Sequence, residues 1–350
     1  MNFATSLTTP QMLVSRANSP TLRNGCMKTD RNGITNQCHK EHIMPAFQTP
    51  DGTKVKMSGK ELVFGENIFS PRESNDILAD TEALRQRMEE DGYLIIRNFH
   101  NREDIMKARK EVVDHMGSQG LLAEGSTLED AIIGDRKRSM RFKDSLVKTW
   151  PGFLNIVDGK NTMDFFGRFL GGPALSLDHK WLRAVRTGGN AGMHCDIVYM
   201  GAGTNNLYTM WTALGDISLD MGPLALCMGS HKLEHLRNTY GASDAHDDLI
   251  QGAFSNDPYD VIETLGTTWA ATPFQAGDVV IFGMYFMHAS LENTTNRFRI
   301  SSDTRYQLAA EATDQRHMGK DPDVIPKADL SERKSIEEYR VEWGLAKETS

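Results

Sequence analysis

The sequence lacks the features that define several protein classes. Only four of its 350 residues are cysteine and none form a Cys-x-x-Cys pair, which speaks against a disulfide framework or a cysteine zinc site and favours a reducing compartment. No apolar run approaches the roughly 20 residues that a membrane helix needs. The net charge of −8 leaves no basic surplus of the kind that nucleic-acid-binding proteins carry. We therefore expect a cytoplasmic protein without membrane or nucleic-acid partners.

Residues 1–45 are poor in acidic side chains, because Asp30 is the only acid before Glu41. The segment is rich in Ser, Thr and Asn, and it has no apolar stretch of the kind found in a secretory signal. Two interpretations remain open. The first is a disordered extension, and the second is a transit peptide that would direct the chain to an organelle.

Apolar periodicity predicts alternating helices and a short strand in the first half of the chain. Residues 81–88, 102–115 and 162–170 have helical spacing, and 93–96 is a short apolar β-run. Further β-like runs separated by turns follow: 181–186, 194–200, 207–214, 224–228, 279–282 and 298–305. We expect a mainly β fold, an antiparallel sandwich or barrel with helices packed on its outside.

We expect residues 46–310 to form one domain. Within it, the polar stretch 232–268 is interpreted as an insertion that serves as a lid or substrate loop. Residues 311–350 are expected to be a charged tail packed on the same domain, with a helix over about 331–343.

His194 and Asp196 are the first candidate metal ligands. If residues 193–199 form a strand, the two side chains share one face and can hold one ion, while Cys195 points to the other face. His288, which follows a buried β-run, is the best candidate for the third ligand. Two histidines and one carboxylate make the facial triad of non-haem Fe(II) oxygenases. The His-x-Asp spacing alone is weak, because a surface His beside an Asp is common.

Residues near His288 suggest a partner for the metal. Arg299 lies eleven residues after His288, and Ser301 shares its face in the expected strand. A guanidinium and a hydroxyl suit the distal carboxylate of a keto acid. Arg297 and Arg305 lie close by, and alternation alone does not separate Arg297 from Arg299. The hydroxyl of Ser290 is expected beside the metal histidine, within reach of a bound keto acid.

These residues together resemble the phytanoyl-CoA dioxygenase family of Fe(II)/2-oxoglutarate oxygenases. The matching pieces are Glu90-Asp91-Gly92-Tyr93-Leu94, His194-Cys195-Asp196, Trp211-Thr212-Ala213-Leu214, Gly222-Pro223-Leu224, Gly229-Ser230-His231-Lys232, Gly277-Asp278, His288 and Arg299-Ile300-Ser301. The resemblance covers about residues 80–308.

The resemblance implies a double-stranded β-helix (jelly-roll, cupin-like) core in which His194, Asp196 and His288 bind Fe(II). It implies that Arg299 holds the C5 carboxylate of 2-oxoglutarate, with O2 as the other cosubstrate. Ser301, Ser290 and Trp211 are expected to contact the cofactor. Two pieces depart from the family pattern, Cys195 for Gln and Met228 for Pro. The related halogenases have Gly or Ala at the place of Asp196, which argues against halogenation here.

We expect the enzyme to oxidise a small organic molecule, by hydroxylation in the first instance, with release of succinate and CO2. Phytanoyl-CoA itself is not expected, since the chain has no C-terminal SKL signal. The alternatives are a jelly-roll metal enzyme without a keto acid and a catalytically silent binding module. Either a monomer or a homodimer is compatible with the sequence.

Other charged residues have competing interpretations. Lys180, Arg183 and Arg186 precede the His194 segment, and alternation could turn a cation toward an acidic substrate or toward 2-oxoglutarate, or else leave it solvated. The four-residue spacing of His231 and His235 could suit a metal, but no HExxH-type glutamate accompanies it, so we favour a turn.

Overall fold

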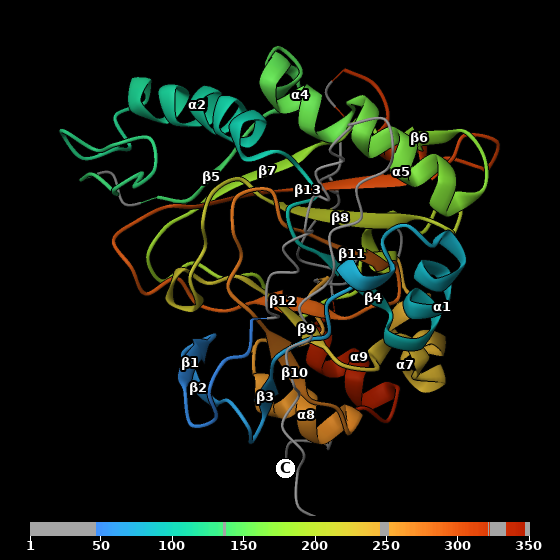
Figure 1. The fold of residues 1–350 in the computed structure, drawn as a ribbon. Helices are drawn as coiled ribbons and strands as arrows, with labels where there is room; N and C mark the ends of the chain where they lie inside the picture. Colours follow the sequence, from blue (N-terminus) through green and yellow to red (C-terminus); the bar gives the residue numbers. More distant parts are fainter. Residues whose placement is uncertain (1–46, 136–137, 246–251, 321, 323–333, 347–350) are drawn as a thin grey trace, which may run out of the picture. The chain divides into compact units, whose positions relative to one another are not determined.

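The computed structural model describes residues 47–135, 138–245, 252–320, 322 and 334–346 (Figure 1). The extension or transit peptide expected over 1–45 therefore lies outside the described residues, as do parts of the expected insertion and tail. The division into a 46–310 domain and a 311–350 tail stays a prediction. Within the described ranges, no helix has the length and apolar character needed to cross a membrane.

The predicted helices in the first half of the chain are confirmed. The long ones are α1 (Thr81–Asp91), α2 (Arg102–Ser118) and α5 (Lys160–Leu170), with α3 (Asp144–Val147) and α4 (Pro151–Val157) between them. The Asp80 side chain accepts the first backbone N–H groups of α1, and Gly92 ends that helix at φ +82°. Such a left-handed residue suits glycine, so both ends of α1 are encoded locally.

The larger sheet is antiparallel throughout. Its strand order is β4-β11-β8-β13-β7-β5, with β6 paired to β13. Its strands are β4 (Tyr93–Ile96), β5 (Met140–Arg141), β6 (Ala174–Ser176), β7 (Trp181–Val185), β8 (Tyr208–Ala213), β11 (Val279–Gly283) and β13 (Arg299–Leu308). Since β11 and β13 are inserted between strands that come earlier in the chain, the sheet forms only when distant segments meet.

The smaller sheet has the order β12-β9-β10-β3, and β1 pairs with β2 in a separate hairpin. Its strands are β3 (Ile68–Phe69), β9 (Leu224–Cys227), β10 (Trp269–Ala271) and β12 (His288–Ser290), and the hairpin is β1 (Lys54–Met57) with β2 (Lys60–Val63). Only the β10–β3 pair of this sheet is parallel.

The two sheets face each other across a hydrophobic core. Trp211 and Phe282 of the larger sheet belong to the same buried cluster as Leu226 and Ala270 of the smaller one. The outer face of the larger sheet is covered by α1 and α5 at one end and by α2 and α4 at the other (Figure 1). This is the expected mainly β architecture with flanking helices, a jelly roll.

The β-run expected over 194–200 is wrong. Met193 and His194 make isolated bridges, but Asp196 is helical (φ −63°, ψ −27°) and α6 (Ile197–Met200) follows directly. The backbone N–H of Ile197 donates to the carbonyl of Met284, which turns the chain out of the sheet. Strand alternation therefore does not explain how His194 and Asp196 come together.

The described parts of the expected insertion and tail contain short helices. The 232–268 stretch contains α7 (Glu234–Asn238) and α8 (Pro258–Leu265), and its role as a lid stays a prediction. The C-terminal helix α9 (Ile336–Glu342) begins at a capping box formed by Ser335 and Glu338. The expected start near residue 331 lies outside the described residues.

Candidate metal centre

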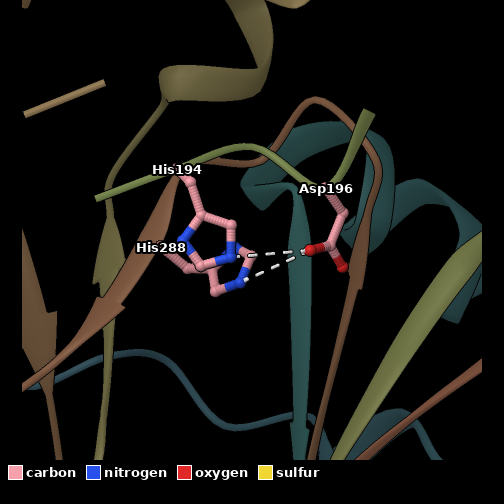
Figure 2. A group of neighbouring side chains, drawn as sticks. All are labelled: His194, Asp196 and His288. Carbon is pink, nitrogen blue, oxygen red and sulfur yellow. Dashed lines mark ion pairs between the residues drawn. The ribbon is translucent and has the colours of Figure 1, made fainter. Parts of the chain in front are cut away.

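His194, Asp196 and His288 converge on one point. The ligand atoms of all three lie within 4.8 Å of one another. Figure 2 shows both imidazoles directing Nε2 toward the carboxylate, at 3.7 Å from His194 and 3.8 Å from His288 to Oδ1 of Asp196. The two histidines also pair through their backbones, His194 N–H to His288 O at 3.0 Å and the reverse bond at 2.9 Å. This cross-sheet bridge sets the distance between the rings.

Backbone carbonyls fix the tautomer of both histidines. Nδ1 of His194 donates to the carbonyl of Gly192 at 2.7 Å, and Nδ1 of His288 donates to that of Phe286 at 3.1 Å. A carbonyl can only accept, so each Nδ1 carries the hydrogen and each Nε2 offers a lone pair. Burial lowers the pKa of His194 to about 4 and also lowers that of His288, which favours the neutral ligand form.

The two carboxylate oxygens of Asp196 have different surroundings. Oδ2 accepts hydrogen bonds from Thr209 and from Arg305. Oδ1 is buried and has no hydrogen-bond partner among the described residues. Burial alone would raise the pKa of Asp196, but the positive charge of Arg305 and the neighbouring imidazoles outweigh it and hold the pKa below its usual range.

These three side chains fit a metal ion. A buried carboxylate oxygen without a partner is costly unless a cation approaches it, and two imidazole lone pairs face the same space. Two histidines and one carboxylate are the donor set of mononuclear non-haem iron. No other group of three or more His, Cys, Asp or Glu within the described residues could hold a metal ion.

Arg299 is buried without a carboxylate partner. Its Nη1 donates to the Ser301 hydroxyl at 2.8 Å, and its Nε has no partner among the described residues. Burial is the main cause that lowers the pKa of Arg299 to about 10. A guanidinium that remains charged here calls for an anion.

The structure separates the three arginines that alternation left together. Arg297 is about half exposed and pairs with Asp130 at 2.9 Å. Arg305 pairs with Asp196 at 3.0 Å. Of the three, only Arg299 is buried without a carboxylate partner among the described residues.

Ser290 and Trp211 are both buried on the inner faces of the sheets. The Ser290 hydroxyl accepts the backbone N–H of Ala191 at 2.8 Å, and its own hydrogen is available to another acceptor. Trp211 shares its face of β8 with Thr209 and packs on Phe274, with ring centroids 4.8 Å apart. Direct contact of these two side chains with a cofactor stays a prediction.

Two residues of the site were not foreseen from the sequence. Thr209 and Arg305 hold Oδ2 of Asp196, yet neither belongs to a recognisable motif. Position 209 lies two residues before Trp211 in a predicted strand, so alternation could have placed it on the same face. Nothing local linked Arg305 to Asp196, since that contact depends on how β13 is paired.

Three of the other candidate residues make contacts away from the metal ligands. Lys180 is buried and pairs with Asp158 at 2.7 Å, and Arg186 donates to the Thr187 carbonyl. His231 contacts the carbonyl of Glu89 at 3.1 Å in a short 3-10 turn, as the preferred interpretation held.

Comparisons with known proteins agree with the geometry. The model of the family described as phytanoyl-CoA dioxygenase (PhyH) matches residues 88–301. The chain is 24% identical over 250 residues to a 1-deoxypentalenic acid 11-beta-hydroxylase of Streptomyces exfoliatus, covering 67% of this chain and 83% of that protein. A protein of the same name from Streptomyces arenae matches to the same extent.

Two solved structures share the fold. The epimerase SnoN, in complex with Fe3+, alpha ketoglutarate and nogalamycin RO, superposes with a TM-score of 0.50 at 17% identity, covering 69% of this chain and 87% of its own. EctD from S. alaskensis in its apoform gives 0.51 at 15% identity, covering 82% and 98%. At this identity the likeness concerns the jelly-roll fold alone.

Proposed function

We propose that this protein, which belongs to the phytanoyl-CoA dioxygenase family, hydroxylates a small organic molecule. It is a 2-oxoglutarate-dependent non-haem iron oxygenase that uses Fe(II), 2-oxoglutarate and O2. Succinate and CO2 are the co-products. This assignment sets aside an enzyme without a keto acid and a silent binding module.

His194, Asp196 and His288 hold the iron in this proposal. The observation that carries it is the buried Oδ1 of Asp196, which lacks a partner among the described residues and faces two unprotonated imidazole nitrogens. When bound, the iron supplies the oxidation of a substrate C–H bond, coupled to decarboxylation of the keto acid. The protein orients the reactants and keeps water out.

Arg299 binds the distal carboxylate of 2-oxoglutarate, with Ser301 holding the guanidinium in position. The support is its burial without an ion pair and its place on the inner face of β13. We assign Ser290 to a contact with the keto acid beside His288, and Trp211 to the apolar wall behind the site. Arg305 and Thr209 act through Asp196, whose carboxylate they aim at the metal.

Hydroxylation is favoured over other outcomes of the same chemistry. The relatives from Streptomyces are named as hydroxylases, and Asp196 fills the coordination position that a halide would need. A small organic substrate accords with the same relatives.

An anaerobic titration tests the proposal. Fe(II) and 2-oxoglutarate added to the full chain should give a weak visible charge-transfer band, and a screen of metabolites should then release succinate. Arg299→Gln should weaken 2-oxoglutarate binding by at least tenfold, while Arg297→Gln, which alters an exposed pair, should not. A wild-type chain that produces no band would refute the assignment.

A further inference from the structure

Two arginines stand directly opposite each other on neighbouring strands. Arg141 of β5 pairs in register with Arg183 of β7, and Arg183 pairs with Ser301 of β13. Directly paired residues of antiparallel strands point to the same face. Arg141 and Arg183 therefore lie on the face that also carries Arg299. Figure 1 shows β5, β7 and β13 side by side, beneath α2 and α4.

This pairing places more positive than negative charge on the face. Arg183 donates from Nε to Asp303 at 3.0 Å. The Arg141 side chain has no hydrogen bond or ion pair among the described residues, and its guanidinium lies 5.8 Å from the ring centre of Trp181. Arg141 is exposed, so this guanidinium is open to a ligand from solution.

The remaining charged groups nearby are already engaged. Asp144 binds His179 and the backbone N–H of Lys180, while Arg305 binds Asp196. These contacts leave the Arg141 guanidinium without a hydrogen-bonded partner among the described residues.

The arginine pair lies beside the metal centre. The guanidinium of Arg183 lies 5.4 Å from the ring centre of Trp181, and that of Arg305 lies 4.1 Å from the same ring centre. Arg305 in turn pairs with Asp196 at 3.0 Å. Trp181 and Arg305 thus connect the arginine pair to the metal centre.

We propose that Arg141 and Arg183 bind a carboxylate of the substrate, so that the enzyme acts on a small organic acid. The inference rests on the proposed function, because it places this carboxylate beside the iron site. Arg299 is reserved for 2-oxoglutarate, whereas Arg141 presents an unused fork of donors that matches a carboxylate. The Trp181 ring lies 5.8 Å from the guanidinium of Arg141 and 5.4 Å from that of Arg183, so one aromatic ring holds both arginines on the same face.

Matched probes test the inference without turnover. The full chain, loaded with Ni(II) and 2-oxoglutarate, is titrated calorimetrically with octanoate, dodecanoate and cyclohexanecarboxylate and with the three corresponding amides. We expect at least one acid to bind tenfold or more tightly than its amide. Arg141→Gln should abolish that preference, and the control Arg186→Gln should retain it. Equal binding of acids and amides, or no binding of any acid, would overturn the proposal.

Two further measurements separate the possible failures. The charge-transfer band of Fe(II) with 2-oxoglutarate should be unchanged in Arg141→Gln. A missing band in the wild type would refute the proposed function, while the acid preference would still be read by calorimetry. Without any acid present, Arg141→Gln should melt at or above the wild-type temperature, because it removes a like-charge pair. A clearly lower melting temperature would assign Arg141 a structural role and overturn the inference.

Discussion

The guanidinium of Arg305 lies 3.0 Å from Oδ2 of Asp196, and both side chains are almost fully buried. The same arginine lies over the Trp181 ring, 4.1 Å from its centre. This ion pair occupies one carboxylate oxygen and leaves the other directed at His194 and His288. The charge of Arg305 thus keeps Asp196 ionised before any metal arrives.

Replacing Arg305 should destabilise the metal-free protein more than the metal-loaded one. Arg305→Met leaves the buried carboxylate of Asp196 without its cation, a loss of about 3–5 kcal/mol in unfolding free energy. A bound divalent ion supplies compensating charge, so Ni(II) should recover much of the loss. Urea unfolding with and without Ni(II) measures this. Arg316→Met, which breaks pairs with Asp314 and Asp244, should cost the same in both states.

Removing the Thr209 hydroxyl should weaken metal binding. Thr209→Val keeps the side-chain shape but deletes the hydrogen bond to Oδ2 of Asp196. Loss of such a support typically lowers metal affinity by about 10–100-fold. Competition with a fluorescent metal indicator provides the affinity. Thr212→Val, on the opposite face of the same strand, is the matched control, and equal losses in both variants would contradict the role given to Thr209.

The Gly277-Asp278 turn should be important for stability rather than for chemistry. Asp278 is buried and accepts hydrogen bonds from the Arg97 side chain at 2.8 Å and from two backbone N–H groups. Asp278→Asn should cost about 3 kcal/mol or more in unfolding free energy. Asp114→Asn, in an exposed pair with Lys110, should cost less than about 1 kcal/mol. Chemical denaturation of both variants compares the two pairs.

Protonation of His100 should contribute to the destabilisation of the fold by acid. Burial lowers the pKa of His100 to about 4 from its usual 6.5. Between these values the unfolded chain takes up a proton that the folded chain refuses, so stability is full above pH 6.5 and falls as the pH drops toward 4. The full loss from this residue is about 3 kcal/mol. His100→Leu should reduce the decrease in unfolding free energy between pH 6.5 and pH 4 by about 3 kcal/mol. An unchanged pH dependence in this variant would contradict the prediction.

Local patterns identified the ligands but not the way in which they meet. His194 and Asp196 were recognised by their spacing, yet the strand that was expected to align them turns into α6 at Asp196. Asp196 reaches the site because Arg305 and Thr209 receive its carboxylate and because Met284 accepts the N–H of Ile197. Arg305 and Met284 lie far from Asp196 in the sequence, so no local signal could report these two contacts, whereas alternation could have suggested the face of Thr209.

The inner face of β13 shows the same division. Alternation could place Arg297, Arg299 and Arg305 on one side of the chain but could not assign their partners. In the structure Arg297 pairs with Asp130, Arg299 donates to Ser301, and Arg305 pairs with Asp196. The sequence could not predict that Arg141 stands opposite Arg183 either, since this pairing depends on the register of β5 against β7.

The sequence by itself determined the ends of α1, most of the strand-forming runs, the donor types of the candidate metal centre and the family resemblance, because capping, periodicity and short motifs act over a few residues. Only the tertiary structure decided which oxygen of Asp196 has no partner among the described residues, which arginine of β13 is buried without a carboxylate, and which arginines stand opposite each other on β5 and β7. Those outcomes depend on burial and on charges brought together from distant strands, and electrostatic energies of this kind exist only once the sheets have paired.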